Sequence, residues 1–429
     1  MSDTLLRGRT LTFHKSPEGV DDTAAYTYEE DGALLMRDGK IIAAGNFDSV
    51  KAKAGAAQII DHRPHLITAG FIDTHVHFPQ VQVIASWGSQ LLDWLNGYVF
   101  PEEARFSDPA HANPMADRFL TLLTDHGTTT AVAFCSVHSP SVEAYFTAAK
   151  TRNMRMIGGK VMMDRNAPDT LQDTAQSGYD DTKDLIEKWH GVGRAGYVIS
   201  PRFAITSSPA QMEMTGVLAQ EHSDCHIQTH LSENRDEIAF ATALYPSAKD
   251  YLDIYESYGL LSDKMLLGHA IHLNDREVAS LASTGAHPVF CPTSNLFLGS
   301  GLFNDARLRD AGITNGIASD IGAGTSYSML QTLNEGYKVL QLQNQSLHAL
   351  RAFDWITRGN ADVLGLADKI GTLDVGTEAD VVVLNARATP AMSLRMERVE
   401  TLADELFLLQ MLGDDRAIVQ TYVAGAAQK

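Results

Sequence analysis

The chain has 429 residues, 44% hydrophobic and 20% charged, which is an ordinary globular composition and leaves room for one large domain with a small appendage. Its formal net charge of −19 is spread along the sequence and disfavours binding to nucleic acid or anionic membrane. The sequence shows no apolar run of roughly 18 residues that could span a bilayer, and its N-terminus does not resemble a secretion signal. Its three cysteines, Cys135, Cys225 and Cys291, are far apart, which favours a reduced cytoplasmic protein in which they serve packing.

Both ends of the chain have the pattern of short β-strands. Residues 4–13 read as one strand, and residues 33–44 read as a hairpin with its turn at Asp38-Gly39-Lys40. Residues 379–384 form a second strong β run. Neither region is large enough to fold alone, so we predict a small β-sandwich domain built from residues 1–66 and 371–429, with a helical region over 392–411. Two unrelated edge hairpins are the alternative.

Between these ends, apolar strand-like runs alternate with helical patterns such as 180–189, 209–220 and 275–283. The expected strands are 67–76, 128–134, 154–162, 196–201, 226–231, 265–269, 286–291 and 315–319. Eight strand–helix units of about 35 residues each match the size of a TIM-type (β/α)₈ barrel, here over residues 67–370. A doubly wound open α/β sheet competes, but no Gly-x-Gly-x-x-Gly follows the first strand.

Residue types that bind metals or transfer protons follow several of the expected strands. In such a barrel the active site lies at the carboxyl ends of the strands. His75 and His77 end the first strand and, being two residues apart, point to the same face, where both can bind one metal ion. The other strand ends contribute Arg202 and Phe203, His230 and Glu233, His269 and His272, and Asp320, while Gln80 follows the first strand. This coincidence predicts a catalytic metal site.

The chemistry of a zinc hydrolase agrees with these residue types. A catalytic zinc ion takes nitrogen and oxygen ligands and keeps one position open for water, whose pKa falls to about 7. A neighbouring carboxylate can then accept the proton and pass it to the substrate. Glu233, three residues after His230, is suitably placed for this role.

Four stretches resemble the amidohydrolase superfamily in its mononuclear deaminase branch: Asp73-Thr-His-Val-His-Phe-Pro-Gln80, Thr229-His-Leu-Ser-Glu233, Gly268-His269 and Ser319-Asp320. Residues 91–95, 158–164, 200–203, 291–295 and 320–325 are similar, more particularly, to the guanine deaminases. The similarity extends from the first strand to Leu384 and includes both terminal β regions.

The resemblance implies roles for specific residues. The implied ligands of one Zn²⁺ per subunit are His75, His77, His230 and Asp320. Glu233 would be the proton shuttle, with His269 and Asp320 helping to activate the water. The purine would contact Gln80, Arg202, Phe203, His230 and His269. Lys160, on the third strand, is interpreted as structural rather than as the modified lysine of binuclear relatives, and the resemblance also implies a homodimer.

The implied reaction is attack of water at C2 of guanine, giving xanthine and ammonia, as in purine catabolism. An arginine can donate to the acceptors O6 and N7, a glutamine amide can pair with N1–H and O6, and a phenylalanine can stack on the ring. Two alternatives remain. The substrate could be another aminated heterocycle, such as 8-oxoguanine or a triazine, undergoing deamination or dechlorination. The chain could also be a non-catalytic scaffold of the same fold.

Overall fold

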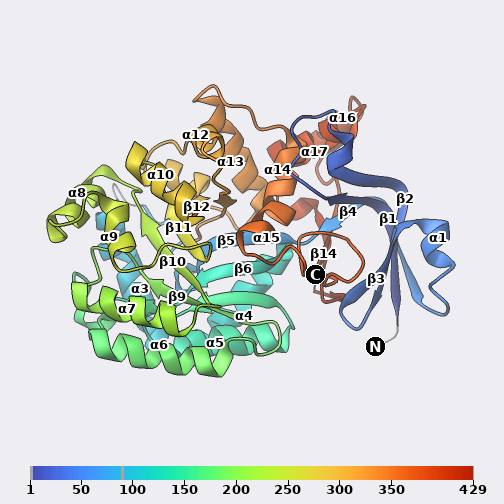
Figure 1. The fold of residues 1–429 in the computed structure, drawn as a ribbon. Coiled ribbons are helices and arrows are strands. Elements are labelled where there is room, and N and C mark those ends of the chain that lie inside the picture. Colours follow the sequence, from blue (N-terminus) through green and yellow to red (C-terminus); the bar gives the residue numbers. More distant parts are fainter. Residues whose placement is uncertain (1–2, 88–90, 429) are drawn as a thin grey trace.

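The computed structural model describes residues 3–87 and 91–428 and consists of a barrel of parallel strands with a second sheet at its side (Figure 1). The barrel strands, in spatial and chain order, are β5 (Phe71–His77), β6 (Thr128–Phe134), β7 (Arg155–Gly159), β9 (Gly196–Pro201), β10 (His226–Leu231), β11 (Met265–His269), β12 (His287–Phe290) and β13 (Gly316–Ile317). A short strand, β8 (Val161–Met162), pairs with β9. The predicted barrel is confirmed.

The barrel closes where its first and last strands meet. The buried amide of Asn360, in α15 (Asn360–Val363), donates to the carbonyl oxygens of Ile72 (2.7 Å) and Ile317 (2.8 Å) and accepts from Ile317 N–H (3.0 Å). Thr74 Oγ1 also donates to Ile317 O at 3.2 Å. A side chain from outside the barrel thus satisfies main-chain groups on both strands of the seam.

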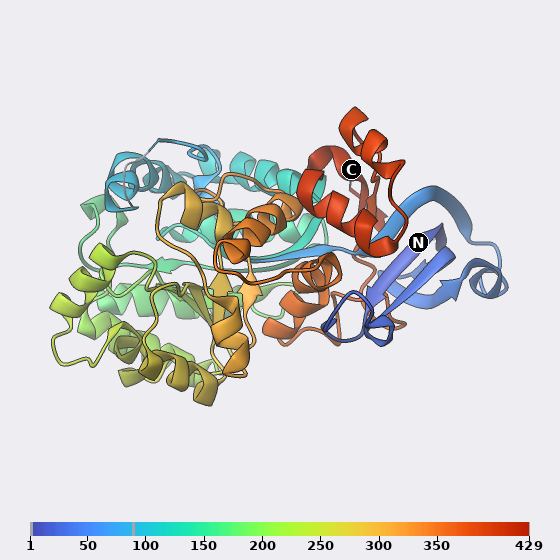
Figure 2. The same cartoon turned by 90° about the horizontal axis from the view of Figure 1, so that it is seen from above.

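Helices surround the barrel (Figure 2). They include α2 (Leu91–Trp94), α3 (Phe100–Ala104), α4 (Pro109–Asp125), α5 (Ser139–Thr151), α6 (Ala175–Trp189), α7 (Pro209–Glu221), α8 (Arg235–Leu244), α9 (Tyr251–Ser257), α10 (Asp275–Thr284), α11 (Pro292–Phe297), α12 (Asp305–Asp310), α13 (Met329–Gln341) and α14 (Ala349–Asp354). The three predicted helices correspond to α6, α7 and α10. Thr174 and Asn274 begin α6 and α10 with capping boxes, which satisfy the first free N–H groups of each helix.

Both ends of the chain build the second sheet. Its strands lie in the order β16 (Ala426–Ala427), β15 (Ile418–Val423), β14 (Val381–Leu384), β4 (Gln58–Ala69), β1 (Thr4–Phe13), β2 (Tyr26–Arg37) and β3 (Lys40–Asn46), in one hydrogen-bonded path. The antiparallel pairing of β14 with β4 joins the C-terminal strands to the N-terminal ones, as predicted. Helix α1 (Phe47–Lys51) follows β3, and α16 (Pro390–Met396) and α17 (Leu402–Leu412) form the predicted C-terminal helical region.

The predicted strand 67–76 proved to be parts of two strands. Residues up to Ala69 belong to β4 in the terminal sheet, and β5 of the barrel begins at Phe71. At Gly70, between them, a Cβ atom would lie 2.3 Å from Thr129 Oγ1, so a side chain there would collide with the residues of β6. A strand buried in the terminal sheet and a strand buried in the barrel have the same apolar sequence pattern. The sequence therefore did not show that the chain passes from one sheet to the other at this point. The division into domains at residues 66 and 371 stays a prediction, since β4 crosses the first boundary.

Two arginines join the terminal sheet region to the barrel. The carboxylate of Glu378 accepts hydrogen bonds from Arg155 Nε (2.7 Å) and Arg194 Nε (2.9 Å), and Arg194 also pairs with Asp380. Glu378 and Asp380 precede β14, whereas the arginines lie at the amino ends of barrel strands β7 and β9. The contact between the two parts of the molecule is therefore partly ionic.

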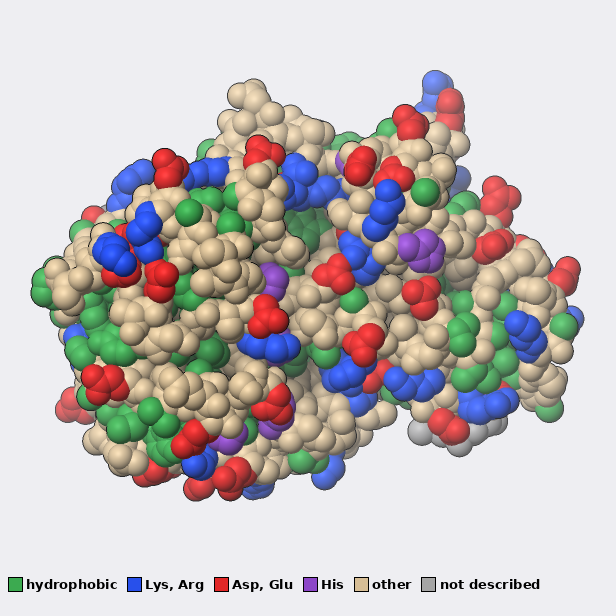
Figure 3. Space-filling view, viewed as in Figure 1, with side chains coloured by type: hydrophobic (Ala, Val, Ile, Leu, Met, Phe, Trp, Pro, Cys, Tyr) green, Lys and Arg blue, Asp and Glu red, His purple; other side chains and the backbone are tan. Residues whose placement is uncertain are grey.

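The surface mixes charges of both signs. On the face shown in Figure 3, acidic and basic side chains are interspersed, so the negative net charge is not gathered into one patch on that face. Among the described helices, none combines the length and the apolar character that crossing a membrane requires.

Candidate active site

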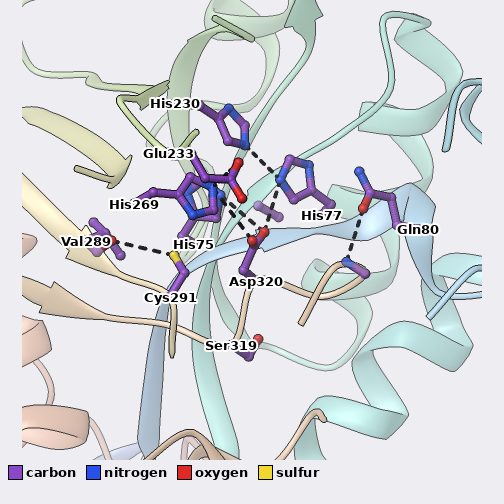
Figure 4. Close-up of polar contacts among 12 residues, drawn as sticks. His75, His77, Gln80, His230, Glu233, His269, Val289, Cys291, Ser319 and Asp320 are labelled. Carbon is purple, nitrogen blue, oxygen red and sulfur yellow. Dashed lines mark hydrogen bonds and ion pairs between the residues drawn. The ribbon is translucent and has the colours of Figure 1, made fainter. Parts of the chain in front are cut away.

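Six polar side chains meet at the carboxyl ends of the barrel strands (Figure 4). They come from β5, β10 and β11 and from the loops that follow β10 and β13: His75, His77, His230, Glu233, His269 and Asp320. The Nε2 atoms of His75 and His77 each lie 3.4 Å from Asp320 Oδ1, and His77 Nε2 lies 3.2 Å from His230 Nε2. Residues 245 positions apart in sequence, from His75 to Asp320, are thus direct neighbours, as the strand-end reasoning predicted.

The donor atoms of this cluster fit a metal ion. His75 Nε2 is buried and has no hydrogen-bond partner among the described residues. His230 Nδ1–H donates to Arg202 O at 2.7 Å, which leaves the lone pair of Nε2 directed at the cluster. Burial lowers the pKa of His75 to about 4 and that of His230 well below its ordinary value, so both rings are neutral near pH 7. Neutral imidazole is the form that binds metals.

Asp320 is held in place by the first strand of the barrel. Its backbone has a positive φ of 52°, which is unusual for a residue with a side chain, and its N–H donates to His75 O at 3.0 Å. Asp73 accepts from Ser319 N–H (3.1 Å) and from the Ser319 hydroxyl. Burial alone would raise the pKa of Asp320, but the adjacent His75 and His77 hold it well below the ordinary range. The carboxylate is therefore ionised and directed at the histidines.

Glu233 and His269 form a second pair at the edge of the cluster. Glu233 Oε2 lies 3.4 Å from His269 Nε2, and burial raises the pKa of Glu233, so that its carboxyl group takes up a proton more readily. Two residues of the segment after β12 orient the pair. Ser300 Oγ donates to Glu233 Oε1 at 2.8 Å, and Asn295 Oδ1 accepts from His269 Nδ1–H at 2.9 Å. Neither role was predicted from the sequence, because hydroxyl and amide side chains are common in helices and loops alike.

A solvent-open cavity lies beside the cluster. Its polar lining includes Gln80 and Arg202 as well as five of the six cluster residues, and Phe203 adds an aromatic ring. Leu91, Trp94 and Leu95 form an apolar wall. The structure therefore brings the predicted substrate-contacting residues to the same cavity as three of the four predicted metal ligands.

Gln80 and Arg202 are connected through a residue that sequence reasoning missed. Glu103, in α3, accepts from Gln80 Nε2 at 2.9 Å and from Arg202 Nη1 at 2.7 Å. Gly322 N–H donates to Gln80 Oε1 at 3.1 Å, and a Cβ at Gly322 would lie only 2.8 Å from the Gln80 Cβ. Glu103 does not follow a barrel strand, and its neighbour Glu102 is also a glutamate. Its position in the sequence therefore did not indicate a role in the site.

Other residues considered from the sequence lie away from the cluster centre. Lys160 is buried and its Nζ pairs with Asp173 Oδ2 at 2.5 Å, in agreement with a structural role. Cys291 is a buried free thiol close to His75, His269 and Asp320, and its Sγ donates to Val289 O at 3.6 Å. His272 contacts Ser300 O at 2.8 Å through Nε2.

Comparisons with known proteins agree with this geometry. Residues 66–427 match the amidohydrolase family. The guanine deaminase of Escherichia coli (strain K12) is 47% identical over 422 residues, covering 98% of this chain and 96% of that protein. Its solved structure superposes with a TM-score of 0.96 at 46% identity, covering 99% of both chains. A structure of guanine deaminase from C. acetobutylicum with bound guanine has a TM-score of 0.89 at 28% identity, covering 99% of this chain and all of the other. The chain belongs to the amidohydrolase family and, within it, to the guanine deaminases.

Proposed function

We propose that this protein hydrolyses guanine to xanthine and ammonia, using one Zn²⁺ per subunit held by His75, His77, His230 and Asp320. The observation that supports the proposal most directly is the buried cluster of imidazoles and carboxylates beside a cavity that also contains Gln80 and Arg202. The high identity to guanine deaminases along the whole chain supports the same substrate.

Zinc bound at this site would supply a water nucleophile that is deprotonated near neutral pH. Around it, Glu233 accepts the proton that the attacking water loses and delivers it to a ring nitrogen as the new C2–O bond forms. His269 and Asp320 orient the water by hydrogen bonding. Glu233 then takes the second proton of the attacking water from the C2 hydroxyl group and transfers it to the amine; the C2–N bond breaks, the C2 carbonyl forms, and ammonia departs. The raised pKa of Glu233 suits a group that both accepts and returns a proton.

The purine is held by its edge and its face. Arg202 donates to acceptors of guanine, the Gln80 amide pairs with N1–H and O6, and Phe203 stacks on the ring, a contact worth about 1–3 kcal/mol. Adenine offers neither O6 nor N1–H, so it would leave the buried polar groups of the site unpaired and bind poorly.

Release of ammonia from a panel of heterocycles tests the substrate assignment. Purified protein is incubated separately with guanine, 8-oxoguanine, adenine and an amino- or chlorotriazine, and ammonia and chloride are measured. We expect rapid ammonia release from guanine and little from adenine. Faster turnover of 8-oxoguanine or of a triazine would instead assign the site to another heterocycle, and no turnover together with no bound metal would favour a non-catalytic scaffold.

Metal analysis tests the cofactor independently of activity. We expect about one zinc ion per chain after gentle purification. Removal by a chelator should lower the midpoint of thermal unfolding, because an ion that binds only the folded state stabilises it, and zinc should restore the midpoint. A homodimer and a cytoplasmic location are part of the same proposal, and sedimentation of the purified protein measures the first of these.

A further inference from the structure

One buried carboxylate joins the two polar side chains that the proposed function assigns to the purine. The Glu103 side chain is only 1% exposed, and both of its carboxylate oxygens accept hydrogen bonds. Oε1 accepts from Gln80 Nε2 at 2.9 Å, and Oε2 accepts from Arg202 Nη1 at 2.7 Å. Gln80 follows the first barrel strand and Arg202 follows the fourth, so Glu103 bridges two walls of the cavity.

We propose that Glu103 is a positioning residue that determines specificity for a neutral purine. It fixes the hydrogen-bonding edges that Gln80 and Arg202 present, and its charge offsets that of the guanidinium. This inference rests on the proposed function, because it requires that Gln80 and Arg202 contact the purine. With this charge balance the site would prefer neutral guanine to anionic purines, which include the deprotonated product xanthine.

The orientation of the Gln80 amide is fixed from both sides. Nε2 donates to Glu103, while Oε1 accepts from Gly322 N–H at 3.1 Å. If the amide rotated by half a turn, its oxygen would face the Glu103 carboxylate and its NH₂ group would face another N–H. Among the described residues, one N–H and one lone pair of Gln80 therefore have no partner, and both point in fixed directions. This donor–acceptor pair is complementary to O6 and N1–H of guanine, which lie side by side.

The guanidinium of Arg202 is fixed in a similar way. Nη1 is bound by Glu103, and the guanidinium carbon lies 5.4 Å from the centroid of the Phe100 ring, in the same helix as Glu103. Arginine carries its charge at all ordinary pH values, and in a buried site an unpaired charge attracts counter-charges strongly. Without Glu103, Arg202 would lose its hydrogen-bonded carboxylate, and an anionic ligand in the cavity could take that place.

The main chain of Glu103 has a separate structural contact. Its carbonyl oxygen accepts from Ser136 Oγ at 2.9 Å, which anchors α3 to the loop after β6. This contact does not involve the carboxylate. Substitutions of the side chain therefore test the positioning role while leaving the anchor of the helix in place.

Two variants separate charge from position. Glu103→Gln keeps the length of the side chain but removes its charge, and Glu103→Asp keeps the charge but shortens the reach. We measure KM and kcat for guanine, zinc content, thermal unfolding, and the inhibition constants of xanthine and urate, which is an anion at neutral pH. The matched control is Glu102→Gln, the adjacent glutamate, which pairs with Arg105 at 2.6 Å instead.

We expect Glu103→Gln to raise KM for guanine by about 10- to 100-fold with zinc content unchanged, since charge-assisted hydrogen bonds to both partners weaken. A second quantity is the ratio of KM for guanine to the inhibition constant of urate. This ratio should rise about tenfold more in Glu103→Gln than in Glu103→Asp, because only Glu103→Gln removes the negative charge that balances Arg202. Glu102→Gln should change neither quantity.

A KM for guanine within about twofold of wild type in Glu103→Gln would overturn the proposal. An equal rise, in both variants, of the ratio of KM for guanine to the inhibition constant of urate would overturn it as well.

The double variant Glu103→Gln/Arg202→Met removes both charges together, which avoids a buried unpaired ion if the single variant does not fold. Its affinity for urate should not exceed that of wild type, and tighter urate binding would contradict the charge-balance role. If the wild-type protein releases no ammonia from guanine, the proposed function itself fails, whatever the variants do.

Discussion

The ring of His230 donates its Nδ1–H to the main-chain carbonyl oxygen of Arg202, at 2.7 Å. The residue whose side chain faces the cavity therefore also orients a histidine of the cluster, but through its backbone. The carbonyl accepts from His230 N–H (3.2 Å) and Thr229 Oγ1 (3.1 Å) as well. The proposed substrate contact and the proposed metal site thus share one residue, but they depend on different groups of it.

Arg202→Ala should retain zinc and lose affinity for guanine. The carbonyl that orients His230 remains in the variant, whereas the guanidinium donors are lost. We expect kcat/KM to fall by about 10- to 100-fold. Metal analysis and steady-state kinetics check both parts, with His230→Ala as the contrast that should lose zinc. Loss of zinc in Arg202→Ala would show that the side chain supports the cluster directly.

Glu233→Gln should bind zinc and guanine but turn over slowly. The amide preserves the shape and can still accept from Ser300, but it cannot accept a proton from water. Removal of a positioned acid–base group costs about 10²- to 10⁴-fold, mainly in kcat. Single-turnover kinetics with metal analysis measures this, and Asp236→Asn, an exposed carboxylate in the following helix, is the control. A near-normal kcat would remove Glu233 from the proton pathway.

Lys160→Met should leave the number of zinc ions per chain unchanged and lower stability. Lys160 Nζ is bound to Asp173, and the variant leaves that carboxylate buried without its cation. Breaking such a pair costs about 3–5 kcal/mol in the free energy of unfolding, measured by urea denaturation. Lys160→Met/Asp173→Leu should recover part of this loss. A drop in metal content with no loss of stability would instead place Lys160 at the metal site.

The contribution of Glu378 to stability should disappear in acid. Burial would raise the pKa of this carboxyl group, but hydrogen bonds and charges of Arg155 and Arg194 outweigh it and hold the pKa below the ordinary value of 4.5. A carboxyl group with a depressed pKa in the folded state stabilises the protein above the unfolded-state pKa, and the contribution is lost as the pH falls through the folded-state value. Glu378→Gln should therefore be less stable than wild type by about 3 kcal/mol at pH 7.

The difference between the two proteins should narrow as the pH falls below about 4.5, where unfolded carboxylates begin to bind protons. Thermal unfolding of wild type and Glu378→Gln across pH 3.5–7.5 checks this, with Glu397→Gln, in a polar segment after α16, as the control. A difference that is constant across this range would mean that the ion pairs with Arg155 and Arg194 do not account for the stability.

The sequence predicted the parts of the site that depend on strand periodicity. His75 and His77 share a face because side chains alternate along a strand, and Asp320 was located by the run of apolar residues before it. The passage between sheets at Gly70 could not be predicted, because residues on either side are buried equally well. The apolar pattern reports burial and not the identity of the neighbouring strand.

The supporting residues were missed for a different reason. Glu103, Asn295 and Ser300 act through contacts with residues distant in sequence, and each is of a type that is common in helices and loops. The positive φ angles of His269 and Asp320 were equally invisible, because only the surrounding hydrogen bonds hold these residues in that conformation. Local sequence identified the candidate chemical groups of the site but not the residues that orient them.

The seam between β5 and β13 has a consequence for biosynthesis. The ribosome releases His75 and His77 first, then His230 and then Asp320. Asn360, which donates hydrogen bonds to both strands of the seam, is translated after all of them. A nascent chain therefore lacks Asp320, the last of the four proposed metal ligands, until most of the barrel has been translated. We therefore expect the metal to be bound by all four proposed ligands only after Asp320 has been translated.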